Sequence, residues 1–229
     1  MRNVFKPLCL TLMLSTACTA FGAGGGEMPS RPMGGSSTPA PSPEEQARSA
    51  YNAGVKVVEK ADQLAADASH QADAKKQAKA LDKANDGYAS ALKKFTRATE
   101  LYPSMHEAWN YVGYTNRKLG KYDAALAAYD RALTLKPGYP EAIEYRGHAY
   151  LGLNRLDDAK AAYLSLFSSN RKLAAQLLAG MQSWVGEHRG NPAGVDGASL
   201  ESFASWVSER SAIASQTAGL TREGASAAW

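Results

Sequence analysis

Cysteine is nearly absent from this chain of 229 residues, and its two cysteines, Cys9 and Cys18, both lie close to the N-terminus. The rest of the chain therefore has no disulfide and no thiolate chemistry, and packing alone must hold it together. Metal and nucleotide motifs are missing as well. No two of the 4 histidines lie three or four residues apart, and there is no GxSxG, GxxxxGK[ST] or CxxC pattern. We therefore expect no catalytic residue, no metal site and no cofactor.

A short apolar run near the N-terminus, residues 7–17, follows the basic residues Arg2 and Lys6. The run is too short to span a bilayer, which takes about 20 residues, but it suits the apolar core of a secretory signal. Small residues then offer a cleavage point after Ala20. The sequence thus predicts a signal peptide over residues 1–20 and a periplasmic or secreted protein. A buried helix or a membrane anchor is the alternative.

Cys18 has a second interpretation. The stretch LSTAC, Leu14–Cys18, resembles the bacterial lipoprotein box, in which a leucine and two small residues precede a lipidated cysteine. Leu14 is one position too far from the cysteine, and Ser15 stands in the usual place of the leucine. Lipidation of Cys18 is therefore the alternative to cleavage after Ala20, and it would make this an outer-membrane-anchored lipoprotein.

Glycine, proline and serine dominate the next segment, residues 21–42. Such a composition cannot offset the entropy lost on ordering, so it predicts a disordered tether. Removal of the leader would take away Arg2 and Lys6 and reduce the formal net charge from +4 to +2. A nearly neutral remainder gives no electrostatic reason to expect a nucleic-acid partner.

From Ser42 onward the composition predicts helices. Ser42, Pro43 and Glu45 combine an N-cap serine, a proline at the first helical position and a glutamate three residues after the cap. No alternating apolar pattern indicates strands. We expect a helix over about residues 43–68, a turn, and a second helix that ends at Leu101.

One stretch of the chain occurs twice. ALAAYDRALTLKP, Ala125–Pro137, matches at six positions ALKKFTRATELYP, Ala91–Pro103, which lies 34 residues earlier. A fixed interval of this size indicates a repeated structural unit.

The unit that contains the second copy resembles the tetratricopeptide repeat. That family's characteristic large, small and proline positions are occupied by Trp109, Val112, Gly113, Ala125, Tyr129, Ala132 and Pro137. The resemblance implies two packed helices in a unit over residues 106–139. Gly120 would end the first helix, and Pro137 would prevent the second from continuing.

The same frame extends in both directions. A third unit over residues 140–173 has Gly147 and Tyr163 at the corresponding positions. The first unit is longer, because Gly54 and Ala91 are 37 residues apart where Gly113 and Ala125 are 12 apart. We therefore predict an elongated first hairpin over residues 43–105, with a separate helical arm as the alternative.

Apolar residues at helical spacing, among them Leu177 and Trp184, continue after the third unit. A repeat array needs a final cover for its open edge, so residues 174–215 are predicted as capping helices, the last one capped by Ser199. Residues 216–229 are predicted as a flexible tail. The expected fold is all-α: a right-handed superhelical array of about three tetratricopeptide units with an elongated first hairpin and C-terminal capping helices.

The resemblance also implies a binding surface. In this family the first helices of successive repeats line a concave groove that binds peptide segments. The groove positions are occupied by Glu107, Asn110, Tyr111, Tyr114, Arg117 and Lys118 in the second unit and by Glu144, Tyr145, His148 and Leu151 in the third. The alternative is that these rings pack against neighbouring helices, including the long hairpin or the C-terminal helix.

The expected function is a non-catalytic protein-interaction module of the bacterial cell envelope that binds another protein or a peptide segment. It would meet a membrane only through an N-terminal lipid anchor, and the sequence sets no oligomeric state. A self-associating scaffold and a lipid-anchored outer-membrane assembly factor are alternatives. An enzyme is a further alternative, which a buried polar cluster in the structure would support.

Overall fold

A computed structural model describes residues 40–191 and 194–226. These residues form eight helices and no strand, which confirms the all-α class. None of the described helices is long and apolar enough to cross a membrane. The predicted signal peptide, Cys18 and residues 21–39 of the predicted tether lie outside the described residues.

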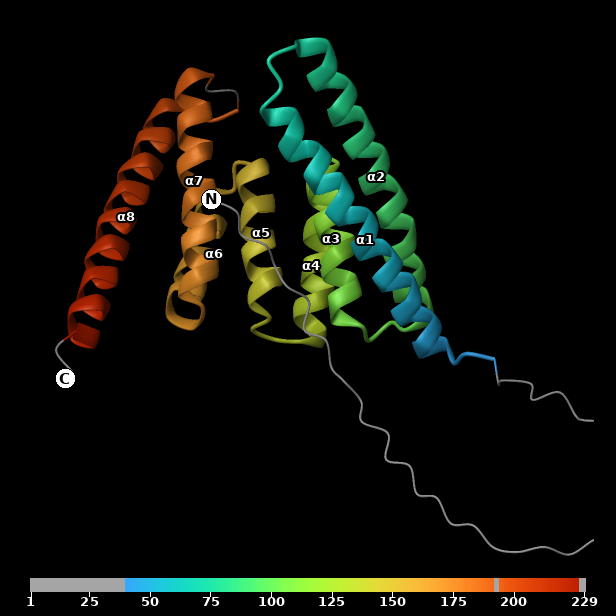
Figure 1. The fold of residues 1–229 in the computed structure, drawn as a ribbon. Coiled ribbons are helices and arrows are strands. Elements are labelled where there is room, and N and C mark those ends of the chain that lie inside the picture. Colours follow the sequence, from blue (N-terminus) through green and yellow to red (C-terminus); the bar gives the residue numbers. More distant parts are fainter. Residues whose placement is uncertain (1–39, 192–193, 227–229) are drawn as a thin grey trace, which may run out of the picture. The chain divides into compact units, whose positions relative to one another are not determined.

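The first two helices, α1 (Pro43–Ser69) and α2 (Ala74–Leu101), form the elongated hairpin that the sequence predicts (Figure 1). The expected capping box starts α1: the Glu45 N–H donates to Ser42 Oγ at 3.2 Å, and the Ser42 N–H donates to Glu45 Oε2 at 2.7 Å. At the turn, Asp73 Oδ1 accepts a hydrogen bond from the Lys76 N–H at 3.0 Å and so starts α2. The two helices have 27 and 28 residues, about twice the 13 or 14 residues of each of the next four helices.

Four shorter helices follow as two pairs: α3 (His106–Lys118) with α4 (Tyr122–Leu135), and α5 (Pro140–Gly152) with α6 (Leu156–Ser169). Gly113 permits the close approach in the first pair, since a Cβ there would overlap the Tyr129 ring. Gly54 has the same role in the long hairpin, where a Cβ would lie 2.6 Å from Phe95 Cε1. Gly120 adopts a φ of 72° just after α3, which explains why a glycine ends that helix.

The chain ends in α7 (Arg171–Gly190) and α8 (Gly197–Ser226). Helix α7 packs against both α5 and α6, and α8 packs against α7. The first helices of successive units, α3, α5 and α7, therefore lie in a row, in which α5 contacts both α3 and α7. Leu177, Trp184 and Phe203 belong to the core that joins α7 and α8 to α5 and α6.

Three details of the C-terminal prediction differ from the structure. Helix α7 starts at Arg171, before the predicted boundary at residue 174, because Asn170 Oδ1 accepts a hydrogen bond from the Leu173 N–H at 3.1 Å. Helix α8 starts at Gly197, and the capping side chain is Asp196, whose Oδ1 accepts from the Ser199 N–H at 2.9 Å. The helix continues to Ser226, past the predicted start of the flexible tail at residue 216; this stretch contains no proline to stop it.

Candidate binding surface

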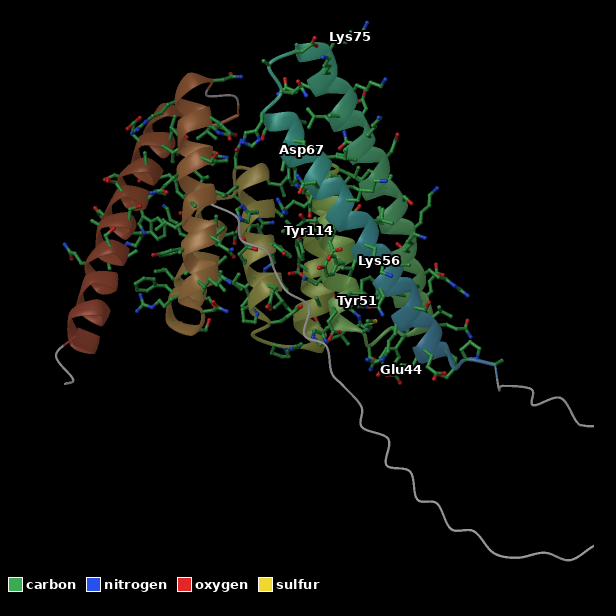
Figure 2. The ribbon with its side chains drawn as sticks, in the orientation of Figure 1. Glu44, Tyr51, Lys56, Asp67, Lys75 and Tyr114 are labelled. Carbon is green, nitrogen blue, oxygen red and sulfur yellow. The ribbon has the colours of Figure 1, made fainter. Side chains whose placement is uncertain are left out.

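A continuous series of tyrosine rings runs from α1 across α3 to α5. Ring centroids are 5.5 Å apart for Tyr51 and Tyr111, 6.0 Å for Tyr111 and Tyr114, and 5.0 Å for Tyr114 and Tyr145. These distances and the edge or tilted geometries are those that aromatic pairs favour. All four rings are partly exposed. We call Tyr51, Tyr111, Tyr114 and Tyr145 the aromatic ladder; Figure 2 labels Tyr51 on α1 and Tyr114 on α3.

Phe95 of α2 packs against the ladder from the core of the long hairpin. Its ring is fully buried and lies 5.8 Å from Tyr51 and 4.8 Å from Tyr111, between centroids. The first two rings of the ladder therefore rest on the core of the long hairpin, which restricts their motion.

The carboxylate of Asp62 on α1 binds one ring of the ladder, Tyr114. The Tyr114 hydroxyl lies 2.7 Å from both Asp62 oxygens, and the Tyr88 hydroxyl donates to Asp62 Oδ1 at 2.7 Å. Lys118 Nζ adds an ion pair to Oδ1 at 3.4 Å. Burial, helped by this carboxylate, raises the pKa of both tyrosine hydroxyls. Asp62 thus ties α1 to α2 and α3 and sets the position of Tyr114.

A partly buried polar cluster lies next to Tyr114 and Tyr145, where α3, α4 and α5 meet. The Arg117 guanidinium lies over the rings of Tyr114 and Tyr145, 5.2 and 5.7 Å from their centroids. His148 Nε2 is 2.8 Å from Glu144 Oε1, and Glu144 Oε2 is buried without a hydrogen-bond partner among the residues that the structure describes. The buried Tyr129 hydroxyl of α4 lies next to Arg117.

Next to this cluster is a hollow of about 440 Å³ between α3, α5 and α7. Its lining includes Arg117, His148, Leu151, Trp184 and His188. The Trp184 indole N–H donates to the Leu151 carbonyl at 2.9 Å, and the His188 ring stacks on Trp184 with 3.8 Å between centroids. Helix α7 therefore covers the third unit at this end of the surface.

The repeated geometry agrees with comparison to known families. Two family profiles, both described as tetratricopeptide repeat, match residues 75–140 and 117–181. Residues 75–181 are thus similar to the tetratricopeptide repeat family. Among solved structures, one similar chain is the first TPR of Spaghetti (RPAP3) bound to HSP90 peptide SRMEEVD. It is 22% identical, with a TM-score of 0.38, and the match covers 55% of this chain and 93% of that chain. No curated protein matches the chain.

The tetratricopeptide frame places the predicted groove residues at two different depths. Asn110, Glu144 and Leu151 are 2%, 5% and 4% exposed, so they fill the seams between helices. The other seven are partly exposed: Glu107, Tyr111, Tyr114, Arg117, Lys118, Tyr145 and His148. Ligand binding by any of these residues stays a prediction. The alternative of packing against the long hairpin and α7 describes Tyr114 and Leu151 well, because Asp62 and Trp184 engage them.

Sequence reasoning missed three components of this tetratricopeptide surface: Tyr51, Asp62 and Tyr139. Tyr51 could have been found, because the alignment of Gly54 with Gly113 places it on the face occupied by Asn110. Asp62 lies in the extra length of the first hairpin, where the repeat frame has no corresponding position. Tyr139 precedes α5, so it lies outside the first-helix positions that line the groove in this family. The centroid of its ring is 4.9 Å from that of the His106 ring.

Two glycines of α7 provide a matched test of how that helix packs on the tetratricopeptide unit. A Cβ at Gly180 would overlap the His148 ring, whereas nothing lies within 4 Å of a Cβ at Gly186. We expect Gly186→Ala to raise the free energy of unfolding by about 0.5–1 kcal/mol through helix propensity. Gly180→Ala should lower it by about 1–3 kcal/mol through overpacking. Urea denaturation followed by circular dichroism measures both, and equal stabilisation by the two alanines would contradict the packing of His148 against α7.

Proposed function

We propose that this protein is a non-catalytic interaction module that docks a segment of another protein on the aromatic ladder. The observation that supports this most is the ladder itself, a set of partly exposed rings held by Phe95 and Asp62. Rigid tyrosine rings supply a large contact area and lose little conformational entropy on binding. They are also enriched among the residues that dominate binding energy in protein interfaces.

A buried polar cluster would support an enzyme, so the partly buried cluster of Arg117, Glu144 and His148 requires a separate explanation. Glu144 and His148 lie one turn apart on α5, and the ring of His148 lies against α7 at Gly180. The 2.8 Å contact between the Glu144 carboxylate and the imidazole holds the ring in the seam between the two helices. No group of three or more metal-ligating side chains occurs in the described part of the chain. We therefore assign the Glu144–His148 pair to the packing of α7.

We also propose that the module works in the bacterial cell envelope. The support is the predicted signal peptide over residues 1–20, with lipidation at Cys18 as the alternative processing. The intact mass of the protein purified from its native cell tests this. A chain that starts at Phe21 indicates simple cleavage, and one that starts at an acylated Cys18 indicates a lipoprotein. An unprocessed Met1 would contradict export.

The docking proposal is tested by photo-crosslinking in the native cell. Glu59 is exposed on α1 and lies within electrostatic reach of Tyr111, so a photoreactive residue there would face a bound partner without disturbing the ladder. We expect one foreign protein to be captured. The double variant Tyr111→Ala, Tyr145→Ala should abolish the capture, because it removes two of the four rings.

The matched control is Tyr150→Phe on α5, which changes a tyrosine outside the ladder and should leave capture intact. Thermal unfolding of each variant shows that it remains folded. Capture of a second copy of this chain alone would overturn the docking proposal in favour of a self-associating scaffold. A partner that the double variant still captures would show that the ladder is not the docking site.

A further inference from the structure

A second aromatic cluster joins α6 to α8 and shares no residue with the ladder. The Tyr163 ring of α6 lies 5.6 Å from the Phe167 ring and 5.4 Å from the Trp206 ring of α8, between centroids. Tyr163 is 1% exposed, whereas Phe167 and Trp206 are partly exposed. Both outer rings pack against the core of the C-terminal helices, so they form a supported surface.

Cations lie over both outer rings. The guanidinium carbon of Arg171 is 3.5 Å from the centroid of the Phe167 ring, and that of Arg210 is 5.6 Å from the centroid of the Trp206 ring. Lys160 Nζ lies 6.0 Å from the same Trp206 centroid. A guanidinium that stacks on a ring uses its flat face, so the N–H groups at its edge can still bind a carboxylate.

Few carboxylates oppose these cations. Among the described residues, Arg171 has none within ion-pair distance. Arg210 pairs at 3.6 Å with Glu209, its neighbour in sequence, and Lys160 pairs at 3.1 Å with Asp157. Both carboxylates are exposed. Exposed pairs of this kind add little to stability, so a carboxylate of a partner can replace them at low cost.

The two arginines both act on one buried group, the hydroxyl of Tyr163. This hydroxyl has no hydrogen-bond partner among the described residues. Burial raises its pKa, while the positive charges of Arg210 and Arg171 lower it, and no carboxylate contributes to the shift. The electrostatic potential between the two guanidinium groups is therefore positive, and it favours an anionic group beside them.

Apolar side chains border the same surface. Leu164 and Ile213 are 48% and 37% exposed, two of the three large apolar residues that are exposed in the described part of the chain. Leu164 lies one turn before Phe167 on α6, and Ile213 lies one turn after Arg210 on α8, so both share a side of their helix with the cluster. We call this set the C-terminal patch: Leu164, Phe167, Arg171, Trp206, Arg210 and Ile213.

The chemistry of the C-terminal patch selects among anionic partners. A nucleic acid or an anionic membrane presents many phosphates and is bound through many basic residues. This patch has two arginines, with Glu209 beside one of them, and a large share of apolar surface. A protein segment that carries both carboxylates and an apolar side chain matches the two parts at once.

From these observations we infer that the C-terminal patch docks an acidic segment of a second partner protein. The carboxylates of the segment bind Arg171 and Arg210, and a large apolar side chain of the segment packs on Leu164, Phe167 and Trp206. This goes beyond the docking proposed for the aromatic ladder. The patch lies on α6, α7 and α8 and the ladder on α1, α3 and α5, so one chain has room for two partners.

The test is selection from a library of random 12-residue peptides displayed between fixed flanking sequences, with the full chain as the target. The wild-type protein should enrich acidic peptides that contain a leucine or an aromatic residue. A selected acidic peptide is then synthesised with blocked ends and titrated by fluorescence anisotropy. Arg171→Gln and Arg210→Gln should each weaken its binding about 2- to 10-fold, because each removes a charged donor from an exposed position.

Two double variants serve as controls. Arg155→Gln, Arg189→Gln removes the same number of positive charges at the opposite end of α6 and α7 and should leave the affinity unchanged. Tyr111→Ala, Tyr145→Ala removes two rings of the ladder and should leave it unchanged as well. A peptide that only the ladder variant fails to bind would support the ladder and overturn the inference about the patch.

Three further results would overturn the inference without affecting the ladder. The first is a selection that enriches no acidic peptide. The second is an equal loss of affinity in Arg171→Gln, Arg210→Gln and in Arg155→Gln, Arg189→Gln, which would reflect net charge alone. The third is a dimer, seen by sedimentation, that dissociates only in the Arg171→Gln, Arg210→Gln variant. It would make the patch a contact between two copies of this chain.

Discussion

Replacement of Phe95 by alanine is expected to lower the free energy of unfolding by about 3–5 kcal/mol. Phe95 is 0% exposed; its ring fills the space left by Gly54 on α1 and supports the rings of Tyr51 and Tyr111. Alanine would leave a cavity between the two long helices, and the glycine opposite has no side chain to fill it. Domains of this size have a total stability of about 5–15 kcal/mol, so the loss would be a large fraction of the whole.

Urea denaturation followed by circular dichroism measures this effect. Leu81→Ala is the matched control on the same helix, because Leu81 is 43% exposed and its truncation should change stability by about 0.5 kcal/mol or less. The Phe95 variant should also bind more weakly to any ladder ligand, since two rings lose their support. An equal, small effect of both substitutions would show that the long hairpin does not depend on this contact.

The second large effect is a loss of stability at high pH. Burial raises the pKa of Tyr88, Tyr114 and Tyr129 above the ordinary value of about 10. Above that pH the unfolded chain releases these protons while the folded chain retains them, so the folded state binds more protons and stability falls as pH rises. Each such tyrosine contributes a slope of about 1.4 kcal/mol per pH unit above pH 10 and nothing well below it.

Urea midpoints at pH 8, 9, 10 and 11, together with tyrosinate absorbance, measure the effect. We expect similar midpoints at the two lower values and a steep fall between about pH 10 and 11. Tyr88→Phe removes one of the late-titrating hydroxyls and should make the fall shallower. Stability that does not change up to pH 11, with early tyrosinate formation in the folded protein, would contradict the burial of these hydroxyls.

Much of the fold could be predicted because its determinants are local. The capping box of Ser42 and Glu45 and the positive φ of Gly120 involve residues close together in sequence. The 34-residue period is equally visible in the chain itself, and it predicted both the pairing of α3 with α4 and the extra length of the first hairpin. The start of α8 was predicted less well, since Asp196 and Ser199 are both good capping residues and only the backbone shows which one caps.

The candidate surface was predicted only in part, because a helical period does not show how deeply a side chain is buried. Asn110 and Tyr111 are neighbours on α3, yet the first is buried in a seam and the second is partly exposed. The same spacing describes a ring that faces a groove and a ring that lies beneath the next helix. Whether a ring faces the groove or is covered depends on how far the neighbouring helix extends.

The sequence by itself determined the helical class, the repeat and the row of first helices, since each follows from patterns within one or two units. Only the tertiary structure decided that Asp62 binds Tyr114, 52 residues away, and that α7 covers Leu151 and His148. The physical reason is that hydrogen bonds and burial between distant segments depend on the positions of whole helices. Those positions result from packing summed along the array, and they leave no periodic trace in the sequence.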